Sequence, residues 1–132
     1  MMIYADANVI IRLLEGLPAV RAPIETHLLP FRGTTGFLAT SRLSRLECRV
    51  KPLRAADSAL LALYDAFFAS SEVVLLEIDA AVVEKATELR STLNIKTPDA
   101  IHLASAVLAK ASNFLTGDRG LSRCTEIAVQ IV

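Results

Sequence analysis

Hydrophobic residues along this chain alternate between short strand-like runs and longer helix-like patterns. Apolar runs typical of strands occur at Met2–Ala5, Phe37–Thr40, Val73–Ile78, Asn113–Leu115 and Ile127–Val132. Between them, apolar residues recur at three- and four-residue intervals, which predicts amphipathic helices. Because the two patterns alternate, they favour an α/β domain built on a mostly parallel sheet.

The expected helices are delimited by capping residues and prolines. They cover Val9–Leu14, Pro18 towards Leu29, Ser41–Val50, Ala55–Ala69, Asp79 to about Leu93, and a segment that begins at Thr97. Asp79 and Thr97 are expected N-caps, because their side chains can accept a hydrogen bond from a free N–H of the first turn. Pro52 is expected to end the third helix, and Pro23 to kink the second or delay its start.

Length and composition predict a single folded domain. The 132 residues contain no linker, repeat or low-complexity segment, so one domain over residues 1–132 is expected. An apolar fraction of 53% with 21% charged residues excludes disorder. No apolar run is long enough to cross a bilayer, so no membrane association is expected. Cys48 and Cys124 are isolated, which argues against a zinc site or disulfide framework and favours a reducing cytoplasm.

Four acidic residues interrupt otherwise apolar surroundings. Each follows a strand-like run or lies on or at the start of an apolar helix: Asp6, Glu47, Asp99 and Asp118. Ligands of open α/β sheets bind at the carboxyl ends of the strands, where such residues can converge. Without cations, the gathered carboxylates would repel one another and be costly to desolvate. Hard divalent ions such as Mg²⁺ prefer oxygen ligands, so we expect the cluster to bind one.

Each acid also has an ordinary structural explanation. Asp6 is a favoured N-cap, and Asp118 lies in a glycine-containing turn sequence. Glu47 can pair with Lys51 one helical turn away, which contributes about 0.2–0.5 kcal/mol. Asp99 is favoured in the first turn of any helix by the helix dipole. The residues taken singly therefore leave both interpretations open.

The helix that carries Asp99 in its first turn is apolar nearly all round, which predicts that it is buried in the domain. His102 lies one turn beyond Asp99 and could face the same site. We expect His102 to be structural or to support the site, because a lone histidine in an apolar helix usually makes a core hydrogen bond.

The charge of the chain is balanced, with 14 Lys+Arg, 14 Asp+Glu and a formal net charge of +0. This balance counts modestly against a nucleic-acid-binding function, which usually goes with a basic excess. Arg42, Arg45 and Arg49 lie on the side of their helix opposite its apolar stripe. Such a face is most often simply solvated, and contact with RNA phosphates is the alternative.

The order of these motifs resembles that of the PIN-domain ribonucleases. The motifs are Asp6-Ala7-Asn8, Ser41-x-x-Ser44-x-x-Glu47, Thr97-Pro98-Asp99-Ala100-Ile101-His102-Leu103-Ala104 and Leu115-Thr116-Gly117-Asp118. The chain is most similar to the short, free-standing VapC-like toxins of bacterial toxin–antitoxin pairs, over essentially its whole length. The resemblance implies a three-layer α/β/α fold with a central, mostly parallel twisted sheet, and an endoribonuclease that depends on Mg²⁺ or Mn²⁺.

The resemblance also implies residue roles and partners. The metal-binding, catalytic acids would be Asp6, Glu47, Asp99 and Asp118. The residues that position carboxylates or waters would be Asn8, Ser41, Ser44 and Thr116. A metal-activated water would hydrolyse the RNA phosphodiester bond without a covalent nucleophile from the protein. Besides RNA, the implied partners are an antitoxin protein and a second copy of the chain.

Two departures from the family pattern keep other functions open. Ala7 stands where relatives usually carry Ser or Thr, and Gly120 where many carry a further acid. A second interpretation is therefore a catalytically weak or inactive module that binds a small antitoxin-type partner. Phosphoryl transfer through Asp6 ranks last, because Asn8 replaces the second acid that such enzymes need. A serine hydrolase is rejected, because the serines lack a visible His–acid relay.

Partner contact is expected at the helix predicted over Ala55–Ala69. It carries more apolar surface than one core face needs, namely Leu60, Leu61, Leu63, Phe67 and Phe68. A helix simply packed in the core is the alternative.

Overall fold

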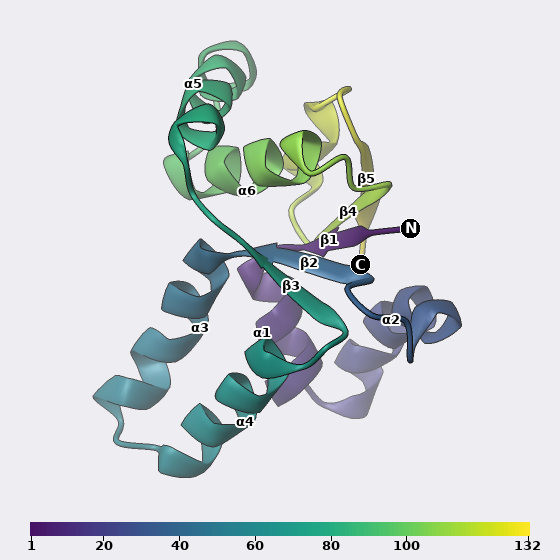
Figure 1. The fold of residues 1–132 in the computed structure, drawn as a ribbon, viewed down its shortest axis with the longest axis vertical. Helices are drawn as coiled ribbons and strands as arrows, with labels where there is room; N and C mark the ends of the chain where they lie inside the picture. The colour runs from purple at the N-terminus through teal and green to yellow at the C-terminus, as the bar shows by residue number, and fades with distance from the viewer.

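Five parallel strands form one sheet, with helices packed on both of its faces (Figure 1). The computed structural model describes all residues, 1–132. The strands are β1 (Ile3–Ala5), β2 (Leu38–Ser41), β3 (Val73–Leu76), β4 (Asn113–Thr116) and β5 (Ala128–Ile131). Their order is β3-β2-β1-β4-β5, and every neighbouring pair is parallel. The expected three-layer α/β/α architecture is confirmed.

Helices join the strands and form the two outer layers. The α-helices are α1 (Ala7–Glu15), α2 (Pro18–Leu28), α3 (Arg42–Arg54), α4 (Ser58–Ala69), α5 (Ala80–Leu93) and α6 (Thr97–Leu108). Two short 3-10 helices are η1 (Leu29–Phe31) and η2 (Arg119–Arg123). In Figure 1, α1 to α4 lie on one face of the sheet, and α5 and α6 on the other. No helix combines the length and apolar character needed to span a bilayer.

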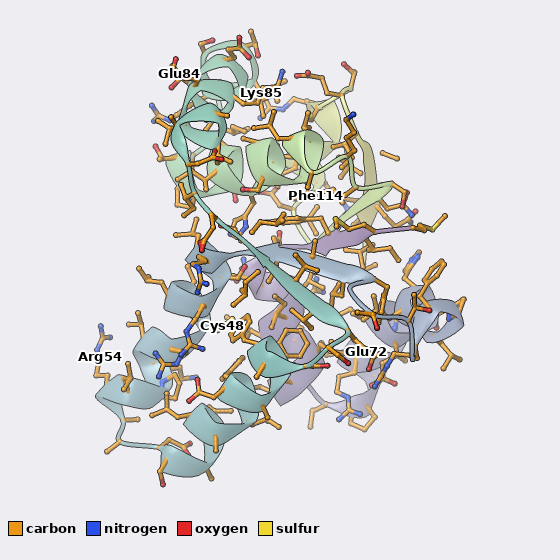
Figure 2. All side chains as sticks on the ribbon, in the orientation of Figure 1. Cys48, Arg54, Glu72, Glu84, Lys85 and Phe114 are labelled. Carbon is orange, nitrogen blue, oxygen red and sulfur yellow. The ribbon has the colours of Figure 1, made fainter.

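Each face of the sheet has its own apolar core. Tyr4 and Phe114 belong to the core under α5 and α6, while Ile3 belongs to the core under α1 to α4. Successive side chains of β1 therefore enter opposite layers, as the geometry of a strand requires. Figure 2 shows Phe114 beneath α6 and Cys48 in the other helical layer. Cys48 and Cys124 are free thiols in different cores.

Pro52 does not end α3, so the break expected there is wrong. The helix continues to Arg54. Backbone bonds close the turns beyond the proline: Ala55 N–H donates to the Lys51 carbonyl, and Asp57 N–H donates to the Pro52 carbonyl. A proline in this position removes one backbone donor. Pro52 is also buried, and that contact with the core helps to offset the lost bond.

The first turn of α5 follows the prediction closely. Asp79 caps it by accepting a hydrogen bond from Val82 N–H at 3.0 Å. For α6 the predicted cap is wrong by one residue, because Thr97 is the first helical residue and Lys96 precedes it without a side-chain capping bond. The second helix runs from Pro18 straight through Pro23, so Pro23 does not delay its start.

The start of α4 differs from the expectation because of a backbone turn. The helix begins at Ser58 rather than Ala55. Ala56 has a φ of +53°, in the left-handed region, which separates α4 from α3. Asp57 then caps α4 by accepting a hydrogen bond from Leu60 N–H at 3.0 Å.

Candidate active site

The strand order reverses between β1 and β4, near the middle of the sheet. From β1 the chain proceeds to β2 and β3 on one side, and from β4 it proceeds to β5 on the other. Asp6 follows β1 directly, and Asp118 lies just beyond β4. Asp6 N–H donates to the Leu115 carbonyl of β4 at 3.3 Å, which holds the two chain segments together. Open α/β sheets bind ligands at such a switch point.

Glu47 and Asp99 come from helices on opposite faces of the sheet. Glu47 lies on α3, which follows β2, and Asp99 lies in the first turn of α6. His102, one turn further along α6, connects the two layers, because its Nε2 lies 2.8 Å from Glu47 Oε1. The expected supporting role of His102 thus takes the form of a direct contact with one of the four acids.

The four acids share one electrostatic environment. Burial raises the pKa of Asp99 above its ordinary value, and the negative charges of Asp118, Asp6 and Glu47 raise it further. Nearby His102 acts in the opposite direction and lowers the pKa of Asp99. Asp99 therefore lies within electrostatic range of all three other acids. Folding brings together carboxylates that are far apart in the sequence.

Asp6 and Asp118 also have the local roles that the sequence suggested for them. Asp6 is 6% exposed and caps α1, with Oδ1 accepting a hydrogen bond from Val9 N–H at 3.0 Å. Asp118 Oδ1 accepts a hydrogen bond from Gly120 N–H at 2.8 Å. Each of these bonds uses one carboxylate oxygen, and the other oxygen of each makes no hydrogen bond within the chain.

Glu47 and Asp99 differ in how they are held. The ion pair suggested between Glu47 and Lys51 is not formed, and Glu47 contacts His102 instead. Asp99 makes no side-chain hydrogen bond within the chain, although it is partly buried. A partly buried carboxylate with a raised pKa and no protein donor is suited to a ligand from solution.

The expected supporting residues act mainly on the backbone. Ser41 caps α3 through Leu43 N–H at 3.0 Å, and Thr116 Oγ1 accepts a hydrogen bond from Asp118 N–H at 3.1 Å. Asn8 is exposed and makes no hydrogen bond within the chain. Thr116 therefore orients the segment that carries an acid, while no role for Asn8 follows from its contacts.

Thr40, which the sequence did not single out, ties the end of β1 to β2 and α3. Its Oγ1 donates to the Ala5 carbonyl at 2.8 Å and lies 2.6 Å from Ser44 Oγ. All three groups are buried. Ala5 immediately precedes Asp6, so Ser44 supports the first acid through Thr40 and the backbone.

Arg12 supports the segment that carries Asp118. Its Nη1 donates to the Val132 carbonyl at 2.9 Å, and its Nη2 is buried without a hydrogen-bond partner. A Cβ at Gly117 would lie 2.9 Å from Nη2, so a side chain there would displace the guanidinium. Arg12 was not expected from the sequence, because it meets a residue 120 positions away.

The two departures from the family pattern have local structural consequences. A Cβ at Gly120 would lie 3.1 Å from Asp118 Oδ1, so a further acid at this position would require Asp118 to shift. Ala7 is 4% exposed and packs in the core under α1 to α4. Ala7 therefore supplies no hydroxyl group, and its methyl group makes apolar contacts in that core instead.

The arginines of α3 form surface ion pairs. Arg42 pairs with Glu77 at 2.6 Å, whereas Arg45 and Arg49 share Asp65 at 3.2 and 3.0 Å. The Arg42–Glu77 pair is exposed, and such pairs contribute about 0–1 kcal/mol, whereas the two pairs with Asp65 are half-buried. A phosphate that approached this face would compete with these carboxylates.

The carboxylates fit a hard divalent cation by chemistry, although they do not form a ready coordination shell. No three Asp, Glu, His or Cys side chains lie close enough together to ligate one ion. Mg²⁺ takes one or two carboxylates directly and keeps several waters. Carboxylate oxygens from separate helices and strands suit this mode of binding, and Asp99 accepts no hydrogen bond from the protein that a metal ion would have to replace.

A separate apolar groove lies at the amino-terminal ends of β2 and β3. Its volume is about 540 Å³, and mainly hydrophobic side chains of α1, α2 and α4 line it. Leu63 and Phe67 of α4 line the groove. Glu72, which Figure 2 labels, is another of the lining residues. Tyr64 and Phe68 of the same helix are buried in the core. Core packing is therefore confirmed for the side that carries Tyr64 and Phe68, and partner contact at the other side stays a prediction.

Comparison with known proteins supplies a family and a fold. The family model described as "PIN domain" matches residues 3–127. A search of the curated proteins finds no match. VapBC2 from Rickettsia felis, solved with promoter DNA, has a TM-score of 0.78 and 16% identity, covering 100% of this chain and 99% of that one. DNA-bound VapBC from Salmonella typhimurium has a TM-score of 0.75 and 16% identity, and the match covers 99% of this chain and 98% of that one. A toxin–antitoxin complex from Klebsiella pneumoniae has a TM-score of 0.70 and 20% identity, and the match covers 100% of both chains. At these identities the likeness shows the fold.

Proposed function

This chain belongs to the PIN domain family, and from that premise we propose that it is an Mg²⁺- or Mn²⁺-dependent endoribonuclease, the toxin of a toxin–antitoxin pair. One observation carries the proposal. Carboxylates from separate elements act on one another at the switch point of the sheet, where the charges of Asp118, Asp6 and Glu47 raise the pKa of Asp99. Such mutual repulsion is relieved by a cation.

Of Asp6, Glu47, Asp99 and Asp118, one or two would bind the cation directly and the others would act through its waters. When bound, Mg²⁺ or Mn²⁺ supplies an activated water and offsets the negative charge that develops on the phosphate. Asp99 is the least constrained of the four acids, since it has no protein donor. Thr116 orients the backbone at Asp118, and Thr40 orients the backbone that leads into Asp6.

RNA would approach the carboxyl edge of the sheet beside the start of α3. Arg42 begins that helix and is exposed, while Arg45 and Arg49 are half-buried beside Asp65, and the exposed side of α3 carries Leu46 and Val50 instead of the expected arginine face. Arg42 would exchange Glu77 for a phosphate at the small cost that an exposed ion pair involves, and Arg45 and Arg49 would have to release Asp65. These arginines belong to the proposal as RNA contacts.

The apolar groove beside α4 is the proposed binding site of an antitoxin-type partner. It lies at the amino-terminal ends of the strands, away from the acids, so a partner could bind there without being a substrate. A structural neighbour of this chain is itself a toxin–antitoxin complex. Homodimerisation, which the family resemblance implies, is part of the same proposal, and light scattering of the purified protein tests it.

A second candidate function is a module that binds an antitoxin-type partner without cleaving RNA. The observation that favours it is the lack of any three side chains close enough to ligate one ion. Ala7, buried where a hydroxyl is usual, is consistent with it. This function predicts tight partner binding and no metal-dependent cleavage.

Digestion of total RNA separates the two functions. Purified protein is incubated with RNA over a titration of Mg²⁺ or Mn²⁺, with a chelator control and with Asp99→Asn as the matched variant. The nuclease predicts cleavage that rises with metal and is absent in the chelator and in Asp99→Asn. Equal cleavage by the wild type and Asp99→Asn points to a contaminant and contradicts the proposal. If the wild type cleaves no RNA at any metal concentration, the binding module is supported.

A further inference from the structure

A continuous chain of hydrogen bonds runs from the core to the acid edge through Tyr4, His102 and Glu47. Tyr4 Oη lies 2.7 Å from His102 Nδ1, and His102 Nε2 lies 2.8 Å from Glu47 Oε1. Tyr4 is fully buried and His102 is 3% exposed, whereas the Glu47 side chain is 33% exposed. The chain thus joins a buried phenol to a carboxylate that solvent can reach.

Tyr4 fixes the direction of these hydrogen bonds. Its Oη already accepts a bond from Ser41 N–H at 3.0 Å. A buried O–H needs an acceptor, and His102 Nδ1 is the acceptor in contact. With Nδ1 accepting from the phenol, the Nε2 hydrogen of His102 donates to Glu47 Oε1 at 2.8 Å.

The phenol itself has little freedom to move. Its ring stacks on Phe114 with centroids 5.2 Å apart and an angle of 6°, and it meets the His102 ring edge-on at 5.9 Å and 67°. Ser41, which donates to Oη, is the N-cap of α3, the helix that carries Glu47. One side chain therefore contacts both the start of that helix and the imidazole that meets its carboxylate.

We propose that Tyr4 and His102 are positioning residues that hold the Glu47 carboxylate in one orientation for a divalent cation. This inference rests on the proposed function, since it gives Glu47 the role of a metal-binding acid. The bond from Nε2–H occupies Oε1 and leaves Oε2 without a hydrogen-bond partner in the chain. A carboxylate oriented in advance loses less rotamer freedom when it binds.

The binding of Mn²⁺ alone, measured by calorimetry on metal-free protein, tests the proposal. Tyr4→Phe and His102→Leu should each weaken Mn²⁺ binding by about 10-fold or more, as loss of a partner that orients a ligand does. His102→Gln should restore most of the affinity, because its amide N–H can replace Nε2–H. Tyr64→Phe is the matched control: Tyr64 is also a buried tyrosine that donates to a carboxylate, that of Glu15. It should bind Mn²⁺ as the wild type does.

The outcomes distinguish this inference from the proposed function. If the wild type binds Mn²⁺ and both Tyr4→Phe and His102→Leu bind it equally well, the positioning role is overturned and the metal site stands. If the wild type binds no Mn²⁺, both are overturned. Long-range ¹H–¹⁵N spectra at neutral pH provide an independent readout, with His27 as the other histidine signal. A protected Nε2–H proton on His102 supports the proposal, and a His102 without a hydrogen on Nε2 overturns it.

Discussion

Two substitutions of Asp6 separate its role as a helix cap from its role as an acid of the site. Oδ1 caps α1 by accepting a hydrogen bond from Val9 N–H at 3.0 Å, and the same carboxylate raises the pKa of Asp99. Asp57 caps α4 with an equal bond of 3.0 Å to Leu60 N–H, in the exposed connection between α3 and α4 (Figure 1). Asp57 therefore serves as a cap without a role in the site.

The expected magnitudes follow from these contacts. Asp6→Ala removes the cap, which costs about 0.5–2 kcal/mol. We expect the upper half of that range, because Val9 is 1% exposed and water cannot readily replace the lost acceptor. A loss of about 1–2 kcal/mol lowers the melting temperature of a domain of this size by roughly 4–7 °C. Asp6→Asn keeps an oxygen acceptor for Val9 N–H and removes the charge, so its stability without metal should equal or exceed that of the wild type.

Urea unfolding and metal-dependent RNA cleavage, measured on the same preparations, provide the assay. Asp6→Ala should lose both stability and cleavage, whereas Asp6→Asn should lose cleavage alone. Asp57→Ala should lose about 1 kcal/mol of stability and cleave RNA normally. Full cleavage by Asp6→Asn would refute the reasoning, because Asp6 would then be a cap and nothing more.

Three further predictions concern other parts of the molecule. Asp99→Asn should abolish cleavage, remain folded and melt at a higher temperature in metal-free buffer, because burial and neighbouring charges oppose ionisation of Asp99. Since the pKa of Asp99 is raised on folding, wild-type stability should fall as pH rises from the ordinary Asp value through the raised one; identical pH slopes for wild type and Asp99→Asn in urea melts would contradict this. Replacing Arg42, Arg45 and Arg49 with Gln should weaken RNA binding and flatten its salt dependence in filter binding, and an unchanged salt slope would mean that these arginines only form ion pairs on the surface. Leu63→Asp should prevent copurification with a co-expressed antitoxin while leaving metal-dependent cleavage intact, and undiminished copurification would exclude the groove as the binding surface.

The elements that local physical chemistry determines could be predicted from the sequence. The buried strand β1 is an uninterrupted apolar run, and the cap at Asp79 depends only on residues within its own first turn. The errors arose where burial outweighed local preference. Pro52 breaks a helix in isolation, yet in this fold it is buried and α3 continues past it. The left-handed backbone at Ala56 has no sequence signal of its own, because alanine rarely adopts this conformation.

The site could be predicted in part for a similar reason. Parallel strands place their carboxyl ends at one edge, so the positions of Asp6 and Asp118 follow once the strands are identified. The contact between Tyr4 and His102 joins residues 98 positions apart, and that between His102 and Glu47 joins residues 55 apart. No periodicity predicts such pairs. From the amino-acid sequence alone, Tyr4 is identified only as a residue of an apolar strand.

The location of Mn²⁺ in a crystal of the protein tests the central claim most directly. Anomalous scattering identifies the ion without assumptions about its ligands. We expect one anomalous-difference peak for Mn²⁺ at the switch point between β1 and β4. It should lie within coordination distance of Asp99 and of at least one of Asp6, Glu47 and Asp118. A crystal soaked in millimolar Mn²⁺ that shows no peak at this edge, or one only at a distant surface, would contradict it.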